Sequence, residues 1–297
     1  MGYKVVVVGA TGNVGREMLT ILAEREFPID EIAAVASSRS QGTEIEFGET
    51  GKMLKCKNIE HFDFTGWDIA LFAAGSGPTA EYAPKAAAAG CIVIDNSSLY
   101  RMDPDVPLIV PEVNPDAIDG YTKKNIIANP NCTTIVTLMA LAPLHRAFGV
   151  KRIFASTYQA VSGSGAMGIV ELEQQVTALA RGRKVNKKVY PHQIAFNALP
   201  HVDVFLENGY TKEEMKMENE GRKIMHHPRF RASTTCVRVP VYRAHSIAVN
   251  AEFAKPVTVA AARRVLKKAP GLDLLDDVPR NVYPLALDTA EKDNCAV

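Results

Sequence analysis

The feature that most restricts the fold lies near the start of the chain, where an apolar strand, a glycine turn and a helix follow one another. Residues 3–8 form a β-branched run, Gly9, Gly12 and Gly15 follow it, and residues 16–26 have helical spacing of apolar side chains. Glycines in this context permit a tight turn and let a pyrophosphate approach the helix N–H groups. The pattern predicts an α/β domain that binds a dinucleotide.

The loop after the second predicted strand carries an arginine where an NAD-selective site carries an acidic residue. Residues 31–36 read as this strand and lead into Ser37, Ser38, Arg39 and Ser40. These four residues include no carboxylate to hold a ribose 2′-hydroxyl, whereas an arginine among hydroxyls suits a 2′-phosphate. We therefore expect NADP rather than NAD; the alternative is that Arg39 is a solvated loop residue.

The strand and helix alternation continues beyond this loop. A hairpin is predicted over residues 43–47 and 52–56, followed by a strand at 68–73, a helix at 79–89 and a strand at 91–95. Ligands of parallel sheets bind at the carboxyl ends of the strands. Arg101 follows Asn96, Ser97 and Ser98 at one such end, and is either a surface charge or a clamp for a phosphate or oxyanion.

A cysteine opens the next predicted helix. Cys132 lies between Asn131 and two threonines, directly before the apolar helical run 135–144. We expect helix N-terminal amides to point at its sulfur, which with the helix dipole would lower the thiol pKa and favour the thiolate, the nucleophilic form. Asn131 can cap the helix or donate to an oxyanion. Cys132 is therefore a candidate nucleophile, and the alternative is an inert buried thiol.

A strand, a glycine-containing loop and a helix are predicted in the segment that starts at residue 151. A strand at 152–159 leads into the glycine-containing segment 161–166, which we expect to be a flexible loop, and then into a helix at 169–181. Such a loop can contact phosphates or a nicotinamide. A simple tight connection is the open alternative.

Four charged or titratable residues follow in the last third of the chain. A helix at 211–225 begins with capping-box spacing and carries Glu213 and Lys216 three residues apart, a spacing that usually makes a surface salt bridge. A strand at 234–241 contains Arg238, and His245 comes shortly after it. His245 titrates near physiological pH, as a general base requires, although a lone histidine is more often structural.

Composition excludes several classes of function. The 297 residues are 47 % hydrophobic and 23 % charged with a formal net charge of +1, which gives no electrostatic footprint for nucleic acid or an anionic membrane. No apolar stretch approaches the roughly 20 residues that span a bilayer, and no signal-peptide pattern precedes the first strand. We expect a cytoplasmic protein whose partners are small molecules or another copy of itself. The five cysteines lack metal-ligand spacing, so we expect reduced thiols and no metal.

Together these motifs resemble the bacterial aspartate-semialdehyde dehydrogenase family over nearly the whole chain. The resemblance rests on Gly9 to Gly15, Asp95 to Ser98 with Arg101, Asn129 to Thr134, Gln159, Glu213 with Lys216, and Arg238 with His245. It implies a Rossmann-type NADP-binding domain at 1–131 and an α+β catalytic and dimerisation domain, like that of glyceraldehyde-phosphate dehydrogenase, at 132–297. The implied protein is a homodimer, and the helix at 169–181 is a candidate interface element.

The implied reaction is the reversible, NADPH-dependent conversion of L-aspartyl 4-phosphate into L-aspartate 4-semialdehyde and phosphate, in lysine, threonine and methionine biosynthesis. By the resemblance, Cys132 forms an acyl-thioester and His245 is the general acid/base, while Gln159 and Asn131 orient the substrate. Arg238 is implied to hold the substrate carboxylate and Glu213 its ammonium, and Arg101 and Lys216 the phosphate. The implied cofactor contacts are Gly9, Thr11, Gly12, Asn13, Val14, Arg39, Ser40, Ser162 and Gly163.

Two other functions stay open at this stage. A related thioester-forming reductase, acting on N-acetyl-glutamyl phosphate or glyceraldehyde phosphate, is one, although Glu213 favours a free amino group. A nucleotide-binding protein that kept the fold without activity is the other. The resemblance also implies a further strand and a helix beyond residue 297 that return to the cofactor site, so we expect weaker cofactor binding by this chain.

Overall fold

The computed structural model describes residues 2–297, which divide into two compact units. The first unit runs to Ile109 and includes Pro115–Pro130, and the second consists of Val110–Asn114 and Asn131–Val297. The domain boundary predicted between residues 131 and 132 stays a prediction.

The first unit is built on a six-stranded sheet in the order β5-β2-β1-β6-β7-β8, and all of its strand pairs are parallel. Residues Val5–Val8 of β1 are fully buried, as expected for a central strand covered on both faces. The predicted α/β fold with a Rossmann-type sheet is confirmed. The strands are β1 (Tyr3–Val8), β2 (Ile29–Ala36), β5 (Lys57–Asn58), β6 (Ile69–Phe72), β7 (Ile92–Asp95) and β8 (Ile126–Ala128).

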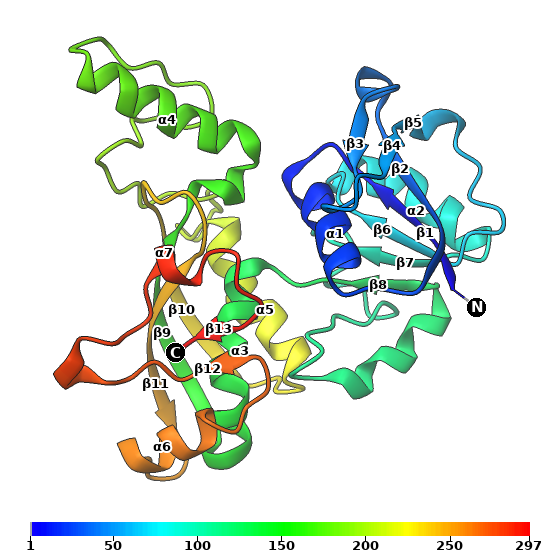
Figure 1. The fold of residues 1–297 in the computed structure, drawn as a ribbon. Coiled ribbons are helices and arrows are strands. Elements are labelled where there is room, and N and C mark those ends of the chain that lie inside the picture. Colours follow the sequence, from blue (N-terminus) through cyan, green and yellow to red (C-terminus); the bar gives the residue numbers. More distant parts are fainter. Residues whose placement is uncertain (1) are drawn as a thin grey trace. The chain divides into compact units, whose positions relative to one another are not determined.

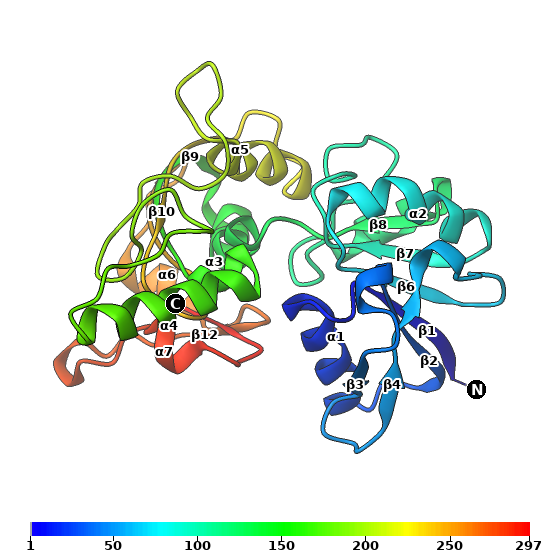
Figure 2. The same ribbon diagram turned by 90° about the horizontal axis from the view of Figure 1, so that it is seen from above.

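Two helices cover this sheet. Helix α1 (Asn13–Glu24) connects β1 to β2, and α2 (Ser76–Ala88) connects β6 to β7 in the opposite direction along the sheet. Right-handed crossovers in opposite directions place their helices on opposite faces, as Figure 2 shows. The predicted hairpin is present as the antiparallel pair β3 (Glu44–Glu46) and β4 (Met53–Lys55). Short 3₁₀ helices lie at η1 (Ser38–Ser40), η2 (Ile59–His61) and η3 (Pro115–Lys123).

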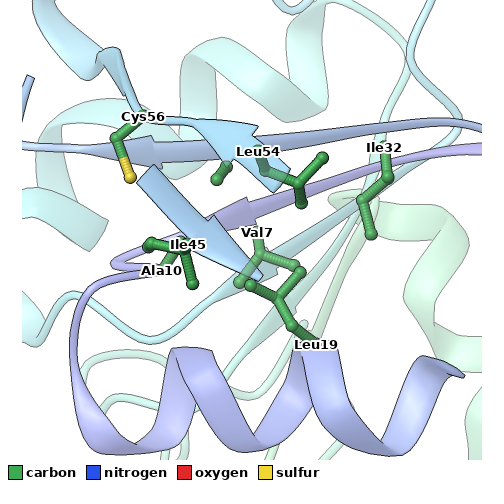
Figure 3. Close-up of a cluster of buried hydrophobic side chains, with 8 residues drawn as sticks. Val7, Ala10, Leu19, Ile32, Ile45, Leu54 and Cys56 are labelled. Carbon is green, nitrogen blue, oxygen red and sulfur yellow. The ribbon is translucent and has the colours of Figure 1, made fainter. Parts of the chain in front are cut away.

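The core on the α1 side joins the helix, the sheet and the hairpin. Leu19 of α1 packs with Val7 and Ile32 of neighbouring strands and with Ile45 and Leu54 of the hairpin, as the close-up in Figure 3 shows. All five side chains are buried. This packing holds α1 against β1 and so fixes the glycine turn between them.

The strand order reverses between β1 and β6, and the turn after β1 lies at this point. Gly9 has a φ of 84°, and a Cβ added there would come within 2.7 Å of the backbone of Ala73, which follows β6. A Cβ on Gly15 would lie 2.3 Å from the carbonyl oxygen of Gly9. These two glycines allow backbone segments to approach closely at the switch point where such sheets bind nucleotides.

The second unit contains a mixed three-stranded sheet in the order β10-β9-β11 (Figure 1). Strand β9 (Val150–Gln159) is parallel to β10 (Arg231–Arg238) and antiparallel to β11 (Ser246–Phe253). Helices α3 (Cys132–Phe148) and α5 (Lys212–Ile224) pack on this sheet. The remaining elements are η4 (Val161–Ser164), α4 (Ala166–Ala180), α6 (Val259–Leu266), β12 (Leu272–Asp273), η5 (Val278–Arg280), α7 (Ala286–Thr289) and β13 (Cys295–Ala296).

The second unit departs from the sequence prediction at several elements. The segment expected to be a flexible loop at 161–166 contains η4, whose amides at Val161 and Ser162 bond to the carbonyls of Val241 and Tyr242. Strand β10 begins three residues earlier than predicted, and β11 was not predicted at all. Strand β11 is an edge strand with most side chains exposed, so its sequence lacks a strong apolar alternation.

Within residues 2–297, none of the helices combines the length and the apolar character needed to cross a membrane.

Candidate active site

Cys132 is the first residue of α3, and Asn131 caps that helix. The side-chain Oδ1 of Asn131 accepts the backbone N–H groups of Thr133 at 3.1 Å and Thr134 at 3.3 Å. It also accepts the hydroxyl of Thr133 at 2.6 Å. The neighbouring Cys132 is exposed. An exposed cysteine at a capped helix N-terminus fits a nucleophile better than an inert core thiol.

The capping geometry corrects one detail of the sequence prediction. The first-turn amides were expected to point at the sulfur of Cys132, yet those of Thr133 and Thr134 donate to Asn131 Oδ1. Because the N-cap oxygen takes these two donors, they act on the thiol through the helix dipole rather than by direct bonds.

Two glutamates of α5 accept the hydrogen bonds that Asn131 donates. Its side-chain Nδ2 donates to Glu213 Oε1 at 3.0 Å, and its backbone N–H donates to Glu220 Oε2 at 2.7 Å. Glu213 is 6 % exposed and Glu220 is 2 % exposed. Sequence reasoning missed Glu220, although its spacing of seven residues from Glu213 places both on one face of the helix.

Glu213 and Lys216 form a partly buried ion pair rather than the surface salt bridge that their spacing usually makes. Lys216 Nζ lies 2.7 Å from Glu213 Oε2 and 3.1 Å from Asp203 Oδ2. Burial raises the pKa of Glu213, but the charge of Lys216 and hydrogen bonds from Lys216, Asn131 and Gln159 outweigh it, and the net pKa is lowered. Burial lowers the pKa of Lys216, yet Glu213 and Asp203 raise it overall. Both groups are therefore charged at neutral pH.

Gln159, the last residue of β9, joins this network. Its Nε2 donates to Glu213 Oε1 at 3.1 Å, and its Oε1 accepts the hydroxyl of Thr157 at 3.0 Å. Gln159 is 1 % exposed, and both ends of its amide are bonded to buried partners. Glu213 Oε1 thus accepts hydrogen bonds from both Asn131 and Gln159, two residues that were predicted separately from the sequence.

The backbone of Ala160 makes hydrogen bonds to both Arg238 and His245. Its carbonyl accepts Arg238 Nη1 at 2.7 Å, and its N–H donates to His245 Nδ1 at 3.0 Å. Since Nδ1 accepts a hydrogen bond, the neutral ring carries its proton on Nε2. Burial and the nearby charge of Arg238 lower the pKa of His245 to about 4. A neutral ring in this arrangement presents an N–H donor at Nε2, and the general acid/base role of His245 stays a prediction.

The predicted cofactor contacts Ser162 and Gly163 lie in η4, beside these side chains. A Cβ on Gly163 would come within 2.8 Å of Arg238 Nη1 and 3.3 Å of His245 Nε2. A glycine is therefore needed for the 3₁₀ turn to approach both side chains.

In the first unit, Arg101 is 8 % exposed. It lies in the loop that follows β7 and reaches the loop that follows β8. Its Nε donates to the carbonyl of Asn129 at 2.9 Å and its Nη2 to that of Asn96 at 3.2 Å. The buried carboxyl group of Asp95 accepts the N–H and the hydroxyl of Ser97, which holds the same loop. Arg101 is therefore a fixed, buried cation rather than a solvated surface charge.

The cofactor residues predicted in the first unit form a turn suited to a dinucleotide. Gly12 precedes α1, and no side chain caps that helix. Thr11 Oγ1 lies 3.4 Å from Ser40 Oγ, so the turn after β1 meets the loop after β2. Arg39 is exposed in η1, and Asn13 and Val14 begin α1. Open helix amides beside hydroxyls and an arginine fit the phosphates of a dinucleotide.

Within the described residues, histidine, cysteine, aspartate and glutamate nowhere gather in a group of three that could hold a metal ion. The structure links Asn131, Gln159, Glu213 and Lys216 in one network, and Arg238 with His245 through Ala160. Arg101 and the residues of the glycine turn belong to the other unit.

Comparisons with known proteins match nearly the whole chain. Residues 4–121 match the family described as semialdehyde dehydrogenase, NAD binding domain, and residues 141–297 match semialdehyde dehydrogenase, dimerisation domain. An aspartate-semialdehyde dehydrogenase of Aquifex aeolicus is 51 % identical over 298 residues, covering 100 % of this chain and 87 % of the relative. One from Legionella pneumophila is 50 % identical, covering 96 % and 82 %. The crystal structure of aspartate semialdehyde dehydrogenase II from Vibrio cholerae complexed with ASA has 44 % identity and a TM-score of 0.95, covering 98 % of this chain and 85 % of the other.

We expect iodoacetamide at neutral pH to modify Cys132 before the other cysteines of the native protein. Cys132 is exposed at a helix N-terminus, whereas burial raises the pKa of Cys236 to about 12 and that of Cys91 to about 11. Peptide mapping by mass spectrometry during a time course measures the order. Equal labelling of Cys132 and the partly exposed Cys295 would contradict an activated Cys132, and unfolded protein serves as the control.

Proposed function

This chain belongs to the aspartate-semialdehyde dehydrogenase family, and we propose that it carries out that reaction through Cys132. The chemistry is the reversible conversion of L-aspartyl 4-phosphate into L-aspartate 4-semialdehyde and phosphate. The observation that supports this most is an exposed cysteine whose neighbour Asn131 shares a buried carboxylate with Gln159. The carboxylate of Glu213 then holds both the cap residue beside the nucleophile and the amide proposed to orient the substrate.

The Cys132 thiolate attacks the acyl carbon of the substrate, the carbon–oxygen bond to phosphate breaks, and phosphate leaves as the thioester forms. When bound, the nicotinamide cofactor would supply a hydride to the acyl carbon. Collapse of the resulting alkoxide breaks the carbon–sulfur bond, so the aldehyde leaves and Cys132 returns as a thiolate. Asn131 and Gln159 are proposed to orient the substrate during these steps.

The charged groups are proposed to hold the ends of the substrate. Arg238 uses one guanidinium nitrogen on Ala160, and its planar fork carries further donors that suit the α-carboxylate. A carboxylate has about four acceptor positions, and Asn131, Gln159 and Lys216 use three of those on Glu213, which leaves room for the substrate ammonium. Arg101 and Lys216 remain the proposed phosphate ligands.

His245 is proposed to act on the substrate oxygen. Sequence reasoning assigned it as the general acid/base, but with Nδ1 bonded to the Ala160 amide its neutral ring offers an Nε2–H donor. Such a donor stabilises the negative charge that develops on the acyl oxygen. Since the alkoxide expels a thiolate directly, the steps above need no base at this position.

NADP is the proposed cofactor, and Arg39 with Ser40 the proposed site of its 2′-phosphate. The glycine turn of Gly9 and Gly12, with Thr11, Asn13 and Val14, is proposed to hold the pyrophosphate. Ser162 and Gly163 are proposed to contact the nicotinamide end, because Gly163 lies against Arg238 and His245.

We further propose a homodimer located in the cytoplasm. The second unit matches a dimerisation-domain family, and one face of its three-stranded sheet carries exposed aromatic side chains, Phe154 at 53 % and Tyr158 at 47 %. Large exposed apolar groups on a sheet face are typical of interfaces. Helix α4 remains a predicted interface element.

The proposed reaction is tested by NADP reduction with L-aspartate semialdehyde, with and without phosphate. Activity should require phosphate, because phosphate must attack the thioester to release the product. Cys132→Ala should lower kcat by roughly a thousandfold or more, since the covalent route is lost. Cys295→Ala is the matched control. Phosphate-independent activity, or a Cys132→Ala enzyme close to wild type, would refute the acyl-thioester route.

Arg39→Ala should raise KM for NADP by about tenfold and leave the weak use of NAD unchanged. The physical reason is the loss of a charge-assisted hydrogen bond to the 2′-phosphate, which NAD lacks. Steady-state kinetics with both cofactors measure this, and Lys52→Ala on the same unit is the control. An equal change for both cofactors would remove Arg39 from the 2′-phosphate site.

Phe154→Glu combined with Tyr158→Glu should convert the dimer into monomers, because two buried charges would face the partner. Sedimentation velocity at micromolar concentration measures the mass. Met53→Glu, which replaces a side chain of equal exposure in the first unit, is the control. A wild-type chain that sediments as a monomer would count against the dimer itself.

A further inference from the structure

We propose that Glu220 is a positioning residue for the nucleophile: it holds the backbone of Asn131 and thereby sets where Cys132 lies. This inference rests on the proposed function only in taking Cys132 as the nucleophile. Glu220 does not need to touch the substrate for this role. It acts through the residue that precedes the cysteine.

The contact is buried, short and long-range in sequence. Glu220 Oε2 accepts the backbone N–H of Asn131 at 2.7 Å, and the two residues are 89 positions apart. Glu220 is 2 % exposed and Asn131 is 6 % exposed, so water cannot readily replace either partner. A buried N–H that loses its acceptor is strongly disfavoured, and the chain around it shifts to find another.

This bond completes the set of hydrogen bonds made by Asn131. Its Oδ1 accepts from Thr133 and Thr134, its Nδ2 donates to Glu213, and its carbonyl accepts the N–H of Ile135 at 2.9 Å. Glu220 takes the one remaining group, the backbone N–H. With both its backbone and its side chain held, Asn131 leaves little freedom to the backbone of Cys132.

Helix α5 is itself firmly attached, which makes it a suitable support. Glu214 Oε1 accepts the N–H of Cys236 at 2.9 Å, and Glu218 Oε2 accepts that of Ala232 at 2.9 Å. A Cβ on Gly221 would meet the ring of Phe230, the residue before β10, at 2.8 Å, so the helix packs closely on that side chain.

The four glutamates of α5 form two pairs that differ in spacing and in the residues they bind. Positions 214 and 218 are four apart and bind β10, whereas positions 213 and 220 are seven apart and reach Asn131. On an α-helix each pair forms its own stripe. One stripe anchors α5 to the sheet, and the other holds the start of α3.

A shift of the nucleophile should appear in the chemistry and not only in stability. Displacing a reacting atom by a fraction of its approach distance lowers the rate of the chemical step. Moving Asn131 also disturbs the capping bonds of α3, on which the thiolate form of Cys132 depends. The expected signature is therefore a lower kcat with a changed pH dependence of thiol reactivity.

The test compares Glu220→Leu, Glu220→Gln and Glu218→Leu in the full chain. Glutamine keeps an acceptor oxygen at the same reach, whereas leucine keeps the bulk and removes the acceptor. Glu218→Leu is the control on the same helix, because it removes a carboxyl-to-amide bond to Ala232, together with an ion pair to Arg222, and neither partner is Asn131. The readouts are kcat and KM, the rate of Cys132 alkylation by iodoacetamide against pH, and the thermal unfolding midpoint.

We expect Glu220→Leu to lower kcat by about tenfold or more and to shift the pH profile of Cys132 alkylation. Glu220→Gln should restore most of both. Glu218→Leu should lower the unfolding midpoint and leave the alkylation profile in place. A folded Glu220→Leu with wild-type kcat and alkylation would overturn the proposal, as would Glu218→Leu moving both to the same extent.

If Glu220→Leu does not fold, Glu220→Asp takes its place, since it keeps the carboxyl group but withdraws it by one methylene. It should show the same shift in alkylation, and a wild-type profile in Glu220→Asp would overturn the proposal. The alkylation readout needs no turnover. A wild-type chain that lacks dehydrogenase activity while its Cys132 alkylation responds to Glu220 would therefore overturn the proposed function alone.

Discussion

The hydrogen bonds of Asn131 are the constraint on which the rest of the candidate active site depends. This residue caps α3 beside Cys132, and its amide and backbone donate to two glutamates of α5. Because Glu213 also accepts from Gln159, the nucleophile's helix, the end of β9 and α5 share one buried network. Unmade hydrogen bonds in such a network are costly, so the positions of its members are coupled.

The same network stabilises the buried charge of Glu213. A carboxylate as buried as Glu213 would be unfavourable alone, but Lys216 lies 2.7 Å away and is itself held by Asp203. The pKa of Glu213 is lowered although burial acts in the opposite direction. The candidate site therefore holds charges of both signs in fixed positions.

His245 shows how a backbone group can decide the role of a side chain. The Ala160 amide cannot change its protonation state, and it donates to Nδ1 of a histidine 85 residues away. The neutral ring must then present Nε2–H, and burial together with Arg238 opposes protonation of the ring. The residue type alone suggested a general acid/base, and its surroundings add which ring nitrogen carries the proton.

Sequence patterns were enough to predict the parallel sheet, its glycine turn, the capping box of Thr211 with Glu214, and the candidate residues. Those features depend on local periodicity, short spacing and residue chemistry, which a sequence displays directly. The tertiary structure alone decided that Glu213 and Lys216 form a partly buried pair, that Asp203 and Glu220 join the site, and that β11 completes the sheet. These outcomes depend on burial and on contacts between residues far apart in the chain, for which local sequence carries no signal.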